Sequence, residues 1–172
     1  PAGSGKGTAS RQVAYALSLP YYSKSCSPMD TTSQWFGYQD ATGRYVPTLF
    51  RNCYESGGVF LLDEIDAANS QVSVSLNAAL ADGQAAFPDK MVERHKDCVI
   101  IAAGNTWGYG ADRVYVGRNQ LDSATLDRFS FVEFDYDEDL ETKIAANKEW
   151  TKHVQRVRRN MFGKISQGQV MR

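Results

Sequence analysis

The sequence lacks the features that mark several classes of protein. No apolar run approaches the ~20 residues of a membrane-spanning helix, so we expect no membrane association. There is no internal repeat and no low-complexity segment. A net charge of −1 provides no overall attraction to nucleic acid. The 172 residues are therefore expected to fold around a sizeable core as a globular protein.

Cysteine is scarce, and its spacing suggests neither a disulfide framework nor a metal site. Cys26, Cys53 and Cys98 are odd in number and widely separated, without the close pairs of a zinc site. Reduced thiols in a cytoplasmic protein are the simplest interpretation. There is no secretory signal, and because the first residue is proline, the start of the chain says nothing more about targeting.

A glycine-rich segment opens the chain, directly before a predicted helix over about Thr8–Leu17. Gly3 and Gly5 allow backbone conformations that other residues avoid, so that successive N–H groups can converge on an anion. The helix start adds partial positive charge, and Lys6 adds a full one for the β- and γ-phosphates of a nucleotide. The segment predicts a Walker A phosphate-binding loop, the alternative being a glycine-rich turn before an ordinary helix. Its binding residues would be Gly3, Ser4, Gly5, Lys6, Gly7 and Thr8.

This loop departs from the usual pattern at two points. Its first glycine and the strand that should precede it are missing, so we expect the chain to be a fragment of a longer protein. Gly7 stands where Ser or Thr usually supplies a hydroxyl for Mg²⁺. Either Thr8 reaches the ion, or waters and phosphate oxygens hold it. Lys6-Gly7-Thr8 is also similar to the loop of adenylate-kinase-like nucleotide kinases, which keeps phosphate transfer open beside hydrolysis.

Two apolar runs end in polar side chains and predict strands of one parallel sheet. Val59–Leu62 is followed by Asp63 and Glu64, a Walker B pattern. Asp63 would hold the Mg²⁺ shell, and Glu64 would activate the attacking water. The run Cys98–Ala103 leads to Asn105, whose amide can hold that water against the γ-phosphate. Ligands of such sheets bind where the strands end.

Arg128 is the last candidate residue. It follows a predicted short helix over Ser123–Asp127. Its permanent planar charge suits stabilisation of phosphoryl transfer. The alternative is a structural salt bridge with Asp127 or Asp122.

The rest of the chain alternates between predicted strands and helices, which is typical of a three-layer α/β fold. A basic stretch begins at Lys143. The further elements are strands at Tyr21–Cys26 and Phe129–Phe134, helices at Thr48–Glu55, Asn69–Ala81 and Asp137–Met161, and hairpins at Tyr38–Val46 and Ala85–Glu93.

Together these motifs resemble the core of an AAA+ ATPase over roughly Pro1–Asp135. The order is the glycine-rich loop, Asp63-Glu64, Asn105 as sensor 1, and Leu126-Asp127-Arg128-Phe129. Asp63-Glu64-Ile65-Asp66-Ala67-Ala68-Asn69 is similar to the Walker B segment of the MoxR-like branch and of the ATPase subunits of magnesium and cobalt chelatases. Ala102–Gly110 is similar to the sensor segment of cobalt-chelatase and phage-type relatives.

The resemblance implies a three-layer P-loop NTPase core with a parallel sheet, β-hairpin insertions and a partial helical lid. Its strand order would be 5-1-4-3-2. The first strand, which would be central, is missing, so we expect this chain alone to bind ATP poorly and to be of doubtful activity. Residues 1–136 would form the nucleotide-binding core and 137–172 the start of the lid. Ile165–Gln169 does not match the expected sensor 2 motif, which leaves a role for Arg172 open.

The resemblance also implies Mg²⁺-dependent ATP hydrolysis that remodels a protein or another macromolecular partner. Arg128 would act as an arginine finger on the neighbouring subunit's nucleotide in a homo-oligomeric, hexameric ring. The two hairpins would face its central pore. The partner would be an unidentified protein substrate or adaptor, for which a von Willebrand A domain protein is one option. Chelatase, MoxR-like and phage-specific roles all stay open.

Other interpretations remain beside this one. A nucleotide kinase is disfavoured because Glu64, a water-activating residue, serves hydrolysis, which a kinase must avoid. A non-catalytic ATP-binding scaffold would not need Glu64, Asn105 and Arg128. Nucleic acid could bind the basic tail, but no base-reading motif supports it. Trp35-Phe36-Gly37 resembles an aromatic pore loop, although buried aromatics under the hairpin would give the same pattern.

Overall fold

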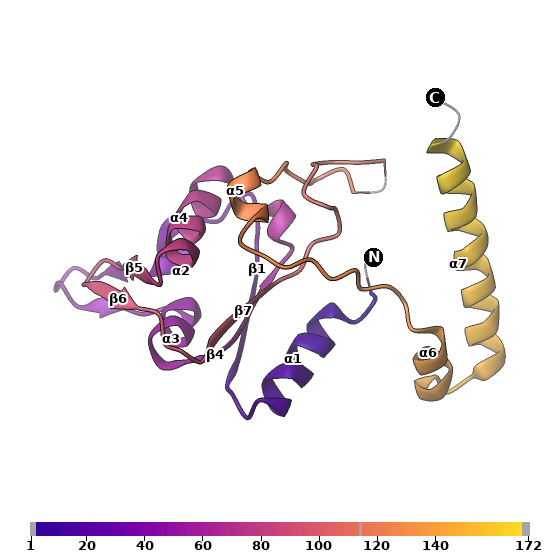
Figure 1. The fold of residues 1–172 in the computed structure, drawn as a ribbon, viewed down its shortest axis with the longest axis horizontal. Helices are drawn as coiled ribbons and strands as arrows, with labels where there is room; N and C mark the ends of the chain where they lie inside the picture. Colours follow the sequence, from indigo (N-terminus) through magenta and orange to yellow (C-terminus); the bar gives the residue numbers. More distant parts are fainter. Residues whose placement is uncertain (1–2, 114, 170–172) are drawn as a thin grey trace. The chain divides into compact units, whose positions relative to one another are not determined.

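The computed structural model describes residues 3–113 and 115–169, with side chains up to Met161 (Figure 1). The chain divides into two compact units, the first ending at Glu133 and the second beginning at Phe134. Pro1 and Ala2 of the glycine-rich segment, and Arg172, lie outside the described residues.

The first unit is built on a parallel sheet of three strands. These are β1 (Tyr21–Ser25), β4 (Gly58–Asp63) and β7 (Cys98–Ala102), in the order β1-β4-β7. The central strand β4 is buried from Gly58 to Leu62, which explains its unbroken apolar run. The fold class and the order of these three strands agree with the sequence-based expectation.

Helices cover both faces of this sheet. In Figure 1, α1 (Lys6–Ala16) lies on one face, and α2 (Thr32–Phe36), α3 (Leu49–Ser56) and α4 (Ser70–Ala81) lie on the other. As predicted, Asn69 caps α4, because its side chain accepts the backbone N–H of Val72. The helices on the two faces leave the carboxyl ends of β1, β4 and β7 at one edge of the sheet.

An aromatic cluster fills the core between the sheet and the helices on its α3 face. Phe50 lies at its centre, with ring centroids 5.4 Å from those of Phe36 and Phe60. Trp35 is fully buried, and its ring nitrogen donates to Asp30. The structure therefore places Trp35 and Phe36 in the core, and the short helix α2 that carries them was missed by the sequence analysis.

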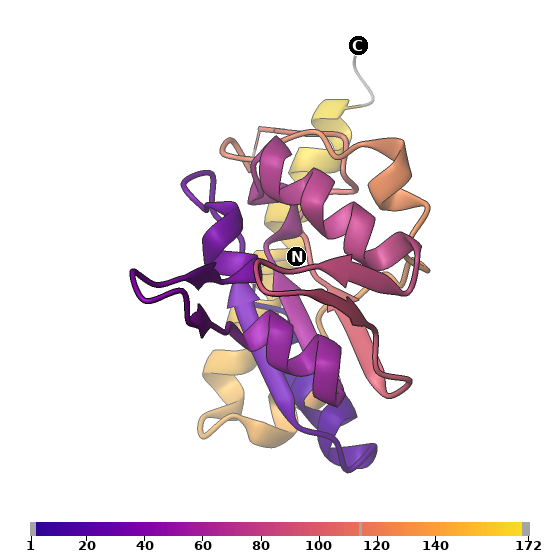
Figure 2. The same ribbon diagram turned by 90° about the vertical axis from the view of Figure 1, so that its left-hand side faces the viewer.

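The two hairpins predicted from the sequence are present, and they extend from the same side of the unit. The first pairs β2 (Tyr38–Gln39) with β3 (Tyr45–Val46), and the second pairs β5 (Gln84–Ala86) with β6 (Met91–Glu93). Figure 2 shows them side by side, and the Gln39 side chain donates to the Pro88 carbonyl across them.

A buried arginine joins α3 to the second hairpin. Arg51 donates from Nη1 to Asp89 at 2.7 Å and from Nε to Glu55 at 2.9 Å. Its guanidinium also lies 4.5 Å from the Phe87 ring centroid and 5.0 Å from that of Tyr45. Burial alone would lower the pKa of Arg51, but the hydrogen bonds to Asp89 and Glu55 hold it above its ordinary value.

The predicted strand at Phe129–Phe134 is wrong. The chain leaves α5 (Ser123–Leu126) and continues without regular structure to α6. An alternating pattern makes a strand only where another strand supplies hydrogen-bonding partners, and no strand among the described residues lies beside this segment. Phe131 and Val132 are accordingly 58% and 81% exposed.

The second unit contains two helices instead of the single helix predicted over Asp137–Met161. These are α6 (Glu138–Ile144) and α7 (Lys148–Gln169). The break arises because Ala145 is extended, with ψ 135°, and because the Asn147 side chain accepts the first N–H groups of α7. An asparagine cap thus starts a new helix where apolar periodicity alone suggests continuation.

The two helices of this unit are held together by polar side chains. Arg158 of α7 binds both carboxylate oxygens of Glu141, each at 2.9 Å. This hydrogen bonding keeps the pKa of Glu141 below its ordinary value. Gln155 donates to the Glu138 carbonyl at 2.9 Å. The pair is therefore fixed by charge-assisted contacts more than by apolar packing.

The structure contains neither a disulfide nor a membrane-spanning helix among the residues that it describes. Cys26, Cys53 and Cys98 are free thiols. No helix in the described part of the chain combines the length and the apolar character of a membrane span.

We predict that Arg51→Ala lowers the free energy of unfolding by about 2 to 3 kcal/mol, because Asp89 loses its cation, Glu55 keeps only Lys90, and space opens among aromatic rings. Urea denaturation followed by tryptophan fluorescence measures the change. Arg44→Ala is the matched control, since the Arg44 side chain is 82% exposed in its pair with Asp40. A similar loss in both variants would contradict the assignment.

Candidate functional site

Polar residues gather at the edge of the sheet where the parallel strands end. Ser25 of β1 lies opposite Asp63 of β4, and Leu62 lies opposite Ala102 of β7. Asp63 is the last residue of its strand, and Asn105 follows β7 after a short turn. Open α/β sheets bind their ligands at this edge.

The glycine-rich loop leads directly into α1. Gly3 and Gly5 have φ values of 73° and 93°, in the left-handed region that favours glycine. Gly5 caps the helix without a side-chain hydrogen bond, and the first turn carries no acidic residue. The helix start and Lys6 together give a region of positive potential that suits a phosphate group.

Lys6 brings the loop together with the end of β7. Its Nζ donates to the side-chain oxygen of Asn105 at 3.1 Å, although the two residues are 99 positions apart. Two residues selected from separate motifs are thus in direct contact. The candidate phosphate-binding cation and the candidate sensor amide therefore lie at one place.

The remaining loop residues lie around this contact. Gly7 faces the sheet, because a Cβ atom there would lie 3.8 Å from the Leu61 side chain. Ser4 is half-buried, and Thr8 is exposed on α1. Among the described residues there is no hydrogen bond between Thr8 and Asp63, so the Thr8 role as a magnesium ligand stays a prediction.

Asp63 has the character of a ligand for a hard cation. One carboxylate oxygen accepts the backbone N–H of Glu64 at 3.0 Å, and no lysine or arginine of the described residues pairs with it. No group of three His, Cys, Asp or Glu side chains in the described residues could hold a metal by itself. This donor set fits Mg²⁺, which takes one or two carboxylates and completes its shell with water and phosphate oxygens.

Glu64 sits in a strained backbone conformation. Its φ of 53° and ψ of 42° are left-handed, at a cost of about 1 to 2 kcal/mol for a residue with a side chain. The strand hydrogen bonds on either side hold it there: Cys26 donates to the Asp63 carbonyl at 2.8 Å, and Ile65 donates to Ala103 at 3.0 Å. The conformation turns the chain abruptly from β4 into a short 3₁₀ turn, Ile65–Ala67.

Asp66, in that turn, is the fully buried carboxylate of the site. Its Oδ2 accepts the backbone N–H groups of Asn105 and Thr106, each at 3.0 Å, and the Thr106 hydroxyl at 2.9 Å. The turn after β7 is therefore fixed to the turn after β4. This fixes the backbone from which the Asn105 side chain extends.

Arg118 is a site residue that the sequence analysis missed. Its Nη2 donates to Glu64 at 3.0 Å, and its Nη1 lies 3.3 Å from Oδ1 of Asp66. Burial alone would lower the pKa of Arg118, but the hydrogen bond to Glu64 and the charge of Asp66 hold it above its ordinary value. One signal could have found it. Asp66 stands between apolar neighbours and so needs a cation, and the glycine-rich loop after Asn105 offers only Arg113 and Arg118.

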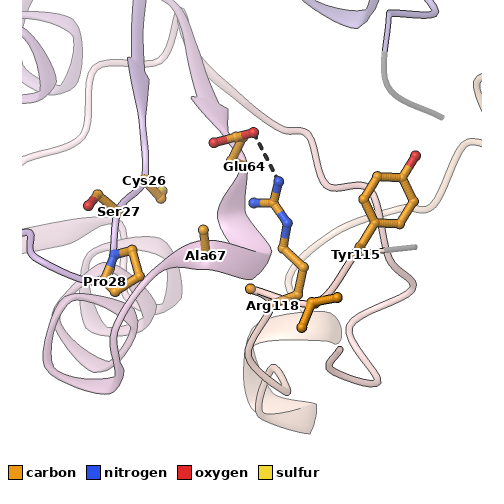
Figure 3. A pocket seen from close by; sticks show the side chains of 9 residues that line it. Cys26, Ser27, Pro28, Glu64, Ala67, Tyr115 and Arg118 are labelled. Atoms are coloured by element: carbon orange, nitrogen blue, oxygen red, sulfur yellow. Dashed lines mark hydrogen bonds and ion pairs between the residues drawn. The ribbon is translucent and has the colours of Figure 1, made fainter. Parts of the chain in front are cut away.

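A pocket of about 430 Å³ opens beside this ion pair. Figure 3 shows Glu64 and Arg118 pointing toward each other across it, with Tyr115 on one side and Pro28 on the other. The carboxylate of Glu64 is 43% exposed, so water reaches it.

Arg128 is not brought to this cluster. It follows α5, is exposed, and makes no side-chain ion pair with Asp127, Asp122 or any other described residue. The alternative of a structural salt bridge therefore has no support in the described part of the chain. An exposed, unpaired arginine remains available to another molecule.

Comparison with protein families gives one match. The model of the AAA domain, dynein-related subfamily, matches residues 1–129. A search of curated proteins returned no match. The matched region extends from the glycine-rich loop to the residue after Arg128.

Solved structures show the same fold at low identity. A chain of Hsp104 in a closed state, solved with ATPγS and FITC casein, has a TM-score of 0.56 at 19% identity and covers 73% of this chain and 26% of its own. A crystal structure from Cytophaga hutchinsonii, whose description proposes an ATPase, has a TM-score of 0.52 at 17% identity and covers 75% of this chain and 39% of its own. This chain thus spans less than half of either protein. These structures confirm the α/β P-loop fold, and the family match supports an ATPase in general terms.

We predict that Asp66→Ala lowers the free energy of unfolding by about 3 to 5 kcal/mol, because two backbone N–H groups lose their acceptor and Arg118 loses a buried partner. Denaturant unfolding measures this loss. Asp82→Ala, at an exposed helix end, should change stability by less than about 0.5 kcal/mol. An Asp66 variant as stable as the Asp82 variant would disprove the role of Asp66 as the anchor.

Proposed function

Because this chain belongs to the dynein-related subfamily of AAA domains, we propose that it binds ATP with Mg²⁺ and hydrolyses the bond between the β- and γ-phosphates. The hydrogen bond of 3.1 Å between Lys6 and Asn105 carries the proposal. It joins the cation of the glycine-rich loop to an amide at the sheet edge where β4 ends in Asp63. Hydrolysis requires a phosphate-binding cation, a metal-binding carboxylate and a water-orienting group at one place.

The loop and Lys6 bind the phosphates in this proposal. The positive φ values at Gly3 and Gly5 let backbone N–H groups approach an anion, and Ser4, Gly7 and Thr8 continue that row. Lys6 exchanges its contact with Asn105 for a phosphate oxygen. Asp63, with Thr8 as a second candidate, holds the Mg²⁺ shell, and the ion supplies neutralisation of charge on the phosphates.

Glu64 and Asn105 act on the water in this proposal. Glu64 is half-exposed at the mouth of the pocket, so its carboxylate can accept a proton from water. Asn105 is fixed through its backbone to Asp66, and its amide then orients the same water. The two residues follow neighbouring strands, and in this proposal they act on the water from one side of the γ-phosphate.

Arg128 completes the proposal as a group supplied to a neighbouring subunit. Its exposure and lack of an ion pair suit a residue that works on another molecule's nucleotide. This requires a homo-oligomer, for which we propose a hexameric ring. Residues 137–172 would belong to the lid. We further propose a protein or other macromolecular partner that is remodelled, and a place in the MoxR-like or chelatase branch of the family.

Glu64→Gln tests the hydrolytic role. The amide cannot take a proton from water, so phosphate release should fall by at least about 100-fold while ATP binding persists. Malachite green detection of phosphate and equilibrium binding of labelled ATP give the two values. The control Glu133→Gln, at an exposed position, should leave both unchanged. Transfer of phosphate to a nucleoside monophosphate, in place of release, would instead indicate a kinase.

Arg128→Ala tests the contribution across subunits. The rate of hydrolysis should fall by about 10³-fold with ATP affinity largely kept, because the lost charge acts on the transition state. Arg113→Ala is the matched control at another exposed position.

Mixing the two inactive variants makes this test specific. A mixed assembly contains interfaces at which an intact Glu64 meets an intact Arg128, so activity should partly return. Mixtures that stay inactive, or an Arg128→Ala protein with unchanged turnover, would exclude an arginine finger acting across subunits.

A further inference from the structure

One guanidinium in the site spans two carboxylates from different parts of the same turn. Nη2 of Arg118 lies 3.0 Å from Glu64, and Nη1 lies 3.3 Å from Asp66. The Arg118 side chain is 14% exposed and Asp66 is fully buried, whereas Glu64 is 43% exposed. The guanidinium is thus bound at its buried end by Asp66 and holds the more exposed carboxylate of Glu64 at its open end, a contact that Figure 3 shows.

The loop that carries Arg118 is itself fixed to the same turn. The backbone N–H of Asn119 donates to the Asp66 carbonyl at 2.7 Å, and the Asn119 side chain donates to Ala68 at 2.9 Å. Two hydrogen bonds of the next residue, Asn119, therefore hold the backbone of Arg118 in place. An arginine whose backbone is tied down in this way has limited freedom to move away from Glu64.

Asp66 connects this arrangement to Asn105. The same carboxylate that pairs with Arg118 accepts the backbone N–H groups of Asn105 and Thr106 through its other oxygen. Asp66 therefore holds both residues: Asn105 through its backbone N–H, and Glu64 through Arg118. Two residues that act on a single water need such a fixed separation, because small displacements in an active site cost large factors in rate.

We propose that Arg118 is a positioning residue for hydrolysis, which holds the Glu64 carboxylate at a fixed separation from the Asn105 amide through Asp66. The inference rests on the proposed ATPase function. Arginine suits this role because its planar fork presents two donors at once, whereas lysine offers a single point charge.

The test compares Arg118→Gln and Arg118→Lys in the full chain. Three quantities are measured: kcat for phosphate release, the Kd for ATP, and the midpoint of urea unfolding. Arg113→Gln, in the same loop but exposed, is the matched control. Arg118→Gln should lower kcat by about 10- to 100-fold with a Kd within about twofold of wild type.

Arg118→Lys separates positioning from stabilisation. Lysine keeps a positive charge beside Asp66, so the unfolding midpoint should recover toward the wild-type value. It cannot reach both carboxylates with a fixed fork, so kcat should stay at least about fivefold below wild type.

The inference is overturned by a lysine variant with wild-type kcat, since charge alone would then suffice. A loss of ATP binding in parallel with kcat, or a lysine variant without a cooperative unfolding transition, would overturn it as well by assigning Arg118 to folding. If the glutamine variant fails to fold, the lysine variant decides. A wild-type protein that binds ATP but releases no phosphate removes the proposed function, and this inference with it, whereas normal turnover of both variants removes this inference alone.

Discussion

A single buried carboxylate connects the parts of the candidate site. Asp66 accepts hydrogen bonds from the turn after β7, pairs with Arg118, and through its carbonyl holds the loop next to that arginine. Such a charge is costly to remove from water, and it is tolerated here because donors from two segments, the turn after β7 and the loop that carries Arg118, pair with it. The segments that carry Glu64, Asn105 and Arg118 are therefore not independent. Their positions relative to one another depend on their shared contacts with Asp66.

Most of the fold was predictable because its signals are local. The apolar run of β4 and the asparagine cap at Asn69 depend on residues next to one another in sequence. The two errors have different causes. Phe129–Phe134 has the alternation of a strand, yet no described strand lies beside it. The helix expected over Asp137–Met161 is interrupted at Ala145–Asn147, where a capping side chain outweighs the helical pattern.

The site was predictable to a similar degree. Gly3, Gly5 and Lys6 were identified from the glycine-rich pattern before a helix, and Asp63 and Asn105 because parallel strands end at a common edge. The structure brings Lys6 and Asn105 into contact. Arg118 was missed because nothing in its own neighbourhood marks it. Its importance comes from Glu64 and Asp66, which lie more than fifty positions earlier and are brought close only by the folded loop. Charge pairs of this kind are decided by tertiary structure.

The left-handed backbone at Glu64 has a consequence for how this protein can be improved. The residue that fits such a conformation best is glycine, which offers no carboxylate, whereas asparagine and aspartate adopt it only occasionally. Selection for thermal tolerance alone would therefore favour removal of the acid at this position. With the role proposed for Glu64, this one φ angle sets stability against catalysis, and engineered stabilisation has to come from positions elsewhere in the chain.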